Sequence, residues 1–126
     1  MHIAWDQLAE IDVCEGEKIW KASGIDIGVN WTSVLVTQTE PGCGPPMHVH
    51  QNDELHILDR CEVDYDIGGE RFHVSGPGLV HIPANVSHCF VNTAPETFRL
   101  VAVFSTEEYT FEPVGPNSIQ SDQIDS

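Results

Sequence analysis

GPPMHVHQNDELHIL, residues 44–58, contains the pattern that decides the fold. His48 and His50 are two positions apart, so on an extended strand both imidazoles leave the same face. Glu54 follows after a polar, turn-like segment that can bring the next strand back beside the first. Two neutral imidazoles and one carboxylate from adjacent strands suit a divalent metal ion such as Fe, Mn, Ni, Cu or Zn. The stretch therefore predicts two short strands with a metal site between them.

A second cluster lies in IPANVSHCFVN, residues 82–92. His88 follows a turn that begins at Pro83, and His88, Phe90 and Asn92 fall on one face of the strand expected there. This cluster adds a further histidine on a strand.

From Ile25 onward, short β-branched and aromatic runs are broken by Gly, Pro and Asn at intervals of about eight to twelve residues, which is typical of a β-sandwich or barrel. The clearest strand is Cys61–Ile67, in which apolar side chains alternate with outward-facing carboxylates. Gly68-Gly69 then predicts a two-residue hairpin, with a returning strand over Glu70–Val74. The other expected strands are Trp31–Thr39, Met47–Val49, Asp53–Leu58, Leu79–Ile82, Ser87–Asn92 and Thr97–Phe104.

The two histidine clusters resemble the two sequence motifs of the cupin superfamily. Gly42, His48, His50 and Glu54 match the first motif, whose last glycine is Cys61 here. The second motif is matched by Pro83, His88 and Asn92. Asn85 stands in place of its inner glycine. The resemblance implies an all-β cupin fold, a double-stranded β-helix or jelly-roll barrel. It also implies one bound divalent metal ion, with His48, His50, Glu54 and His88 as ligands and positions left open for a substrate.

Two further residues are candidates for acid–base catalysis. His56 has the same strand parity as Glu54, so it should point into the barrel, where an imidazole can act as a general acid or base. The alternative is a core histidine hydrogen-bonded to a backbone carbonyl. Tyr65 is a second candidate on a neighbouring strand. His81 has the opposite parity, and His73 is expected to face solvent.

The charge of the chain limits its partners. Twenty Asp and Glu against five Lys and Arg give a formal charge of −15, which repels phosphate backbones and anionic lipid. We therefore expect neither a nucleic-acid partner nor a membrane partner. The five cations are also too few for a polyanionic substrate, so we expect a small, mostly apolar small-molecule substrate anchored by the metal.

The cysteines and the first residues of the chain indicate the cellular compartment. Four cysteines without a Cys-X-X-Cys pair indicate neither a disulfide framework nor a zinc finger. The first residues lack a basic region followed by a long apolar stretch, so no signal peptide is expected. Both observations favour a cytoplasmic protein.

The chain divides into three expected segments. Residues 1–24 form an N-terminal segment whose tryptophans could contribute to a homodimer contact, residues 25–112 form the cupin barrel, and residues 113–126 form a mobile C-terminal tail.

The resemblance leaves three functions open. The stretch GPPMHVHQNDE is most similar to small cupins related to quercetin-type dioxygenases, which implies a dioxygenase acting on a small enolic or aromatic substrate. The first alternative is a non-oxidative, metal-dependent isomerase, lyase or cyclase with His56 or Tyr65 as acid or base. The second is a non-catalytic cupin that binds a small ligand.

Overall fold

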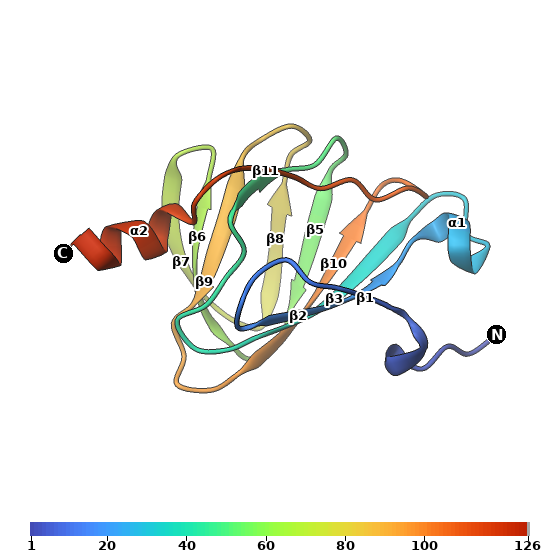
Figure 1. Cartoon of the computed structure of the whole chain (residues 1–126), viewed down its shortest axis with the longest axis horizontal. Helices are drawn as coiled ribbons and strands as arrows, with labels where there is room; N and C mark the ends of the chain where they lie inside the picture. Colours follow the sequence, from blue (N-terminus) through green and yellow to red (C-terminus); the bar gives the residue numbers. More distant parts are fainter. Residues whose placement is uncertain (126) are drawn as a thin grey trace.

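The computed structural model describes residues 1–125 and is built from two antiparallel β-sheets that face each other (Figure 1). The six-stranded sheet contains, in spatial order, β1 (Ala9–Ile11), β2 (Glu17–Ala22), β3 (Ser33–Thr39), β10 (Phe98–Phe104), β5 (Glu54–Leu58) and β8 (Gly78–Ile82). The five-stranded sheet contains β11 (Glu112–Gly115), β4 (Met47–Val49), β9 (His88–Asn92), β6 (Glu62–Ile67) and β7 (Glu70–Ser75). This arrangement confirms the all-β jelly-roll prediction.

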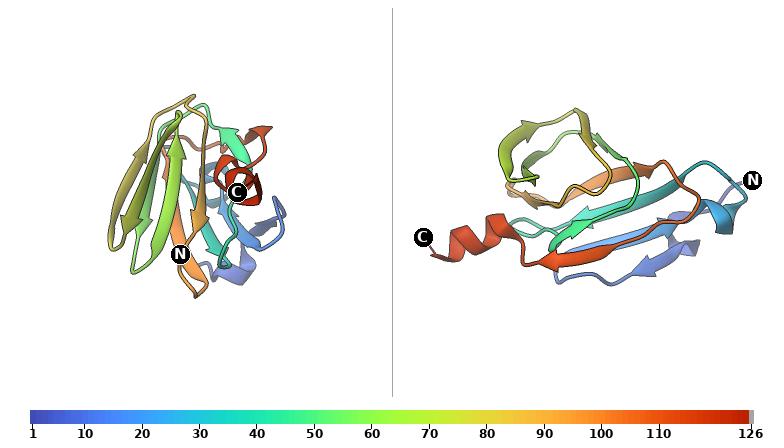
Figure 2. Two further views of the ribbon diagram at one scale, coloured as in Figure 1. Left: turned by 90° about the vertical axis from the view of Figure 1, so that its left-hand side faces the viewer. Right: turned by 90° about the horizontal axis from the view of Figure 1, so that it is seen from above.

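Short helical elements lie outside the sheets. They are the 3-10 helix η1 (Trp5–Gln7), α1 (Gly24–Ile27) and α2 (Ser118–Asp125). The two ends of the chain lie at opposite ends of the long axis, with α2 beyond β6 and β7 (Figure 1). Figure 2 shows that the strands curve around a common interior. No helix within residues 1–125 combines the length and apolar character needed to cross a membrane.

The β6–β7 hairpin follows directly from its sequence pattern. Val63 and Tyr65 on β6 are fully buried, as their alternation predicts. Gly68 and Gly69 have φ angles of 59° and 86°, the left-handed values that a tight two-residue hairpin requires. Ile67 therefore pairs with Glu70, and this pairing sets the register of β6 against β7.

The inward faces of the two sheets form one hydrophobic core. Its buried members come from β2, β3, β5, β6, β8, β9 and β10, and they are Ile19, Leu35, Leu58, Val63, Tyr65, Val80, Ile82, Phe90, Phe98, Leu100, Ala102 and Phe104. Because this core fixes the strand faces, it also fixes which polar side chains point inside.

The six-stranded sheet begins before residue 25, the boundary expected from the turn spacing. β2 pairs with β3 along its whole length, from Glu17 opposite Thr39 to Ala22 opposite Val34. Ile19 at the centre of β2 is only 4% exposed. Nine residues of the expected N-terminal segment, in β1 and β2, thus belong to the sheet, while the role of the segment in a homodimer stays a prediction.

The segment expected to be a mobile tail contains β11 and α2. β11 pairs with β4, and Asn117 then joins the segment to the barrel. The Asn117 amide donates to the carbonyls of Pro45 and Phe90, at 2.8 and 3.1 Å, and its oxygen accepts from the first backbone amides of α2. α2 also covers Asp66, which is 5% exposed and accepts a hydrogen bond from Ser118. Asp66 was expected on the outer surface, and it is buried because this helix lies over it.

We predict that Asn117→Ala lowers the free energy of unfolding by about 2–4 kcal/mol, because two buried carbonyls lose their donor and α2 loses its cap. Urea denaturation measures this. Asn30→Ala is the matched control, since Asn30 is exposed, and it should change stability by less than about 0.5 kcal/mol. Equal stability of the two variants would contradict the anchoring role of Asn117.

Candidate metal centre

Three histidines converge inside the barrel at one end of the five-stranded sheet. His48 on β4 is the register partner of His88 on β9, and His50 immediately follows β4. Their ligand nitrogens all lie within 4.8 Å of one another. The three side chains are 5%, 4% and 1% exposed for His48, His50 and His88. The two histidine motifs of the sequence therefore meet in space.

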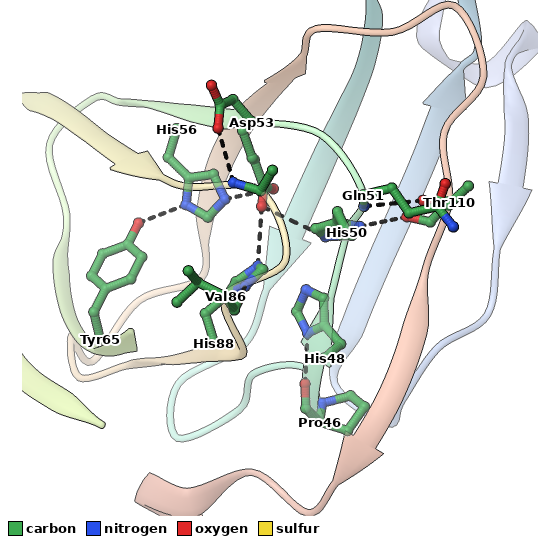
Figure 3. A network of polar contacts seen from close by, with 12 residues as sticks. Pro46, His48, His50, Gln51, Asp53, His56, Tyr65, Val86, His88 and Thr110 are labelled. Carbon is green, nitrogen blue, oxygen red and sulfur yellow. Dashed lines mark hydrogen bonds and ion pairs between the residues drawn. The ribbon is translucent and has the colours of Figure 1, made fainter. Parts of the chain in front are cut away.

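Backbone carbonyls orient all three imidazoles (Figure 3). The Nδ1 of His48 lies 2.7 Å from the Pro46 carbonyl, and that of His88 lies 2.9 Å from the Val86 carbonyl. The Nδ1 of His50 lies 2.5 Å from the carbonyl of Thr110. A carbonyl can only accept, so each Nδ1 must carry the proton. Each Nε2 is then left with a free lone pair, the form in which histidine binds metals.

Glu54 approaches the histidines from β5 of the other sheet and is 4% exposed. Its Oε1 lies 3.0 Å from the Nε2 of His88 and 3.6 Å from that of His50. The carboxylate oxygen thus lies beside two of the three converging imidazole nitrogens, and nitrogen and oxygen donors together suit borderline divalent metals.

Two atoms of this cluster lack hydrogen-bond partners among the described residues. They are the Oε1 of Glu54 and the Nε2 of His88, both buried. Although 3.0 Å apart, they do not form a hydrogen bond with each other. Leaving two such atoms unpaired costs free energy, and one divalent cation would satisfy both. The site fits one divalent metal ion on this ground.

The electrostatics of the cluster favour the protonation states that bind metal. Burial, reinforced by the imidazole of His88, lowers the pKa of His48 to about 3. Burial also lowers the pKa of His50. Burial alone would raise the pKa of Glu54, but the neighbouring imidazoles of His56, His88 and His50 hold it well below its usual range. His48 and His50 are therefore neutral and Glu54 is ionised, so these three groups can bind a metal without first losing a proton.

His56 lies between Glu54 and Tyr65, and Figure 3 shows its ring directed toward the Tyr65 hydroxyl. The Nε2 of His56 lies 2.8 Å from Oε2 of Glu54, and its Nδ1 lies 2.8 Å from the Tyr65 hydroxyl. The carboxylate can only accept, so Nε2 of His56 carries a proton and donates it to Oε2. Burial raises the pKa of Tyr65, so its hydroxyl keeps its proton. His56 thus points into the barrel and is 2% exposed, with Nε2 directed at Glu54 and Nδ1 at Tyr65, while a catalytic role for it stays a prediction.

A cavity of about 30 Å³ adjoins the metal centre. Several of its walls come from residues that the sequence did not single out: Glu17, Thr37, Tyr109 and Phe111. Glu17 lies on the same inward face of β2 as Ile19, but no strand was expected there. Tyr109 and Phe111 belong to the segment after β10, and their rings lie 5.4 Å from His50 and 4.7 Å from His48. No local pattern places that segment over the histidines.

The remaining sequence candidates lie outside the cavity. His81 is exposed on the outer face, 3.7 Å from Asp53. His73 is exposed between Asp64 and Glu62, as expected. Tyr65 is completely buried behind His56.

The fold and the buried histidine cluster are those of a cupin. The family model of the cupin domain matches residues 35–104, more than half of the chain, and the chain belongs to this family. A search of curated proteins finds no match to the sequence.

Solved structures of oxalate decarboxylases share the fold. A variant of the Bacillus subtilis enzyme superposes with a TM-score of 0.79 at 15% identity, covering 97% of this chain and 36% of that one. The Lactobacillus farciminis enzyme in complex with formate gives 0.79 at 16% identity, covering 96% and 39%. A further Bacillus subtilis structure, described by its Mn(II) centres, gives 0.78 at 16% identity, covering 97% and 36%. The chain thus spans less than two fifths of each of these proteins.

We predict that the purified chain binds one divalent ion and that His88→Ala weakens this binding at least about 100-fold, because one of the converging nitrogens is lost. Isothermal titration with Mn²⁺ or Co²⁺ measures both affinities. His81→Ala removes an exposed imidazole and should leave the affinity unchanged. If His88→Ala and His81→Ala bind the ion with equal affinity, the ion does not bind at the three histidines.

A separate prediction concerns His56. His56→Leu should lower metal affinity about 10–100-fold, because Glu54 loses the partner that orients it. His56→Gln keeps an N–H donor and should lose less. His73→Leu, at an exposed position, is the control. If His56→Leu binds metal within twofold of wild type while remaining folded by circular dichroism, the orienting role is wrong.

Proposed function

We propose that this chain is a metal-dependent enzyme that acts on a small oxygen-bearing molecule. The observation that carries this proposal is the buried set of three histidines and Glu54 beside an internal cavity. His48, His50, His88 and Glu54 would hold the metal, which supplies a Lewis-acid centre with positions open to a substrate. A site that served structure alone would not need the adjoining space.

The lining of the cavity indicates the class of substrate. Among the described residues that line it, none is Lys or Arg, so no side chain there can neutralise a polyanion. Ile19, Leu35, Leu100 and Phe90 contribute apolar surface. The small volume favours molecules of a few atoms unless Tyr109 and Phe111 move outward. A compact enolic compound fits these limits better than a fused aromatic one.

For the reaction, we propose dioxygen-dependent carbon–carbon cleavage, with O2 as the oxidant and both of its atoms incorporated into the products. His56 supports this choice, because its two ring nitrogens are already hydrogen-bonded to Glu54 and Tyr65. It is therefore poorly placed as a free general base. The chain would contribute by binding the substrate, orienting Glu54 and excluding water with the apolar lining.

A non-oxidative lyase or isomerase is the second candidate. The favouring observation is that His56 both lines the cavity and contacts the Tyr65 hydroxyl, so a proton could move between them. The solved structures of similar fold are decarboxylases by name, at 15–16% identity. A ligand-binding cupin without turnover is the third possibility, and the same assay separates all three.

The test is an oxygen-uptake assay of the Fe-, Mn- and Ni-loaded protein with small diketones, catechol and enolic acids. We expect one O2 consumed per substrate cleaved, and loss of uptake in His88→Ala but not in His81→Ala. The same product formed at an equal rate without oxygen, or with Zn²⁺ bound, would support the non-oxidative candidate instead. Binding without any product would support the third.

A further inference from the structure

The barrel interior contains a second group of polar side chains, separate in sequence from the histidine motifs. Glu17 on β2 and Thr37 and Thr39 on β3 all face inward, beside the apolar side chains of Ile19 and Leu35. Glu17 is register partner to Thr39, and Thr37 is partner to Ile19. Glu17, Thr37 and Thr39 are 7%, 5% and 0% exposed. Glu17 and Thr37 line the same cavity as the metal centre.

Glu17 is a buried carboxyl group without a cationic partner among the described residues. The Thr39 hydroxyl donates to its Oε2 at 3.1 Å. The other titratable groups that interact electrostatically with Glu17 are Glu54, Tyr109, Cys14 and Cys43. Burial raises the pKa of Glu17 to about 7, with Thr39 opposing and Glu54 adding to the rise. At neutral pH the group therefore exists in part as a carboxylic acid, which can donate a hydrogen bond.

Thr37 provides an independent observation. Its hydroxyl is buried and has no hydrogen-bond partner among the described residues. A buried hydroxyl without a partner destabilises the fold, and valine would fill the same volume without that cost. The hydroxyl thus offers an unused hydrogen bond to whatever occupies the cavity.

We propose that Glu17 and Thr37 form a substrate-binding subsite, which receives the outer oxygen atoms of a small molecule whose other end is held at the metal centre. This inference rests on the proposed function, since it assumes a metal-bound substrate. The ligand class is a compact molecule with oxygen atoms at both ends, such as a dicarboxylic, hydroxy or keto acid. A protonated Glu17 and a threonine hydroxyl can both donate to those oxygens without adding a cation.

The test compares two probes on the Co²⁺-loaded protein, followed by its visible absorption spectrum. Formate has one carboxylate and reports on the metal centre alone, whereas oxalate has outer oxygens that can reach the subsite. We expect Glu17→Leu and Thr37→Val each to weaken oxalate binding about tenfold, the loss of one hydrogen bond, and to leave formate binding within about twofold. Glu17→Gln keeps a donor and should retain oxalate binding. Glu15→Leu is the control at an exposed neighbouring position.

A second readout does not depend on a ligand. Thr37→Val should raise the melting temperature of the metal-free protein, because the unpaired hydroxyl is removed, while weakening oxalate binding. If Thr37 only stabilised the barrel, Thr37→Val would lower both the melting temperature and the affinity for oxalate.

The outcomes separate the two proposals. If metal and formate bind but oxalate binds equally well in all variants, the subsite is wrong and the metal centre stands. If oxalate does not bind to the wild type while formate does, the subsite is also wrong. If no metal binds, the proposed function fails and the subsite with it.

Discussion

The Glu54 carboxylate is buried inside an apolar barrel, where an unpaired charge would cost several kcal/mol. The surrounding polar groups compensate this charge. His56 holds one oxygen, and Tyr65 fixes the far side of His56. The other oxygen faces His88 and His50 without a hydrogen bond. The hydrogen bonding is complete at Oε2 and incomplete at Oε1, where one divalent cation would satisfy the carboxylate.

The two sheets contribute different halves of this site. The five-stranded sheet brings His48 opposite His88, whereas the six-stranded sheet supplies Glu54 and, from its far strands, Glu17 and Thr37. Neither sheet alone could assemble the cavity. Packing of the hydrophobic core therefore sets the separation between the three histidines and the pair Glu17 and Thr37.

Much of the centre could be predicted because its information is local. The parity of His48 and His50, and the Gly68-Gly69 turn, need only a strand and its period. Glu17 escaped prediction because charged and aromatic residues interrupt the alternation in β2, which is recognisable as a strand only through its pairing with β3. β11 and α2 were missed for a related reason, since Asn117 anchors them through contacts with Pro45 and other residues distant in the chain.

X-ray absorption spectroscopy of the metal-loaded protein can identify the ligands, because multiple scattering from imidazole rings counts the histidines bound to the ion. We expect three imidazoles, from His48, His50 and His88, with one carboxylate oxygen and light-atom ligands at about 2.0–2.2 Å if zinc is the reporter ion. One imidazole fewer should be counted in His88→Ala. Two or fewer imidazoles in the wild type, or sulfur scattering at about 2.3 Å, would contradict this ligand set.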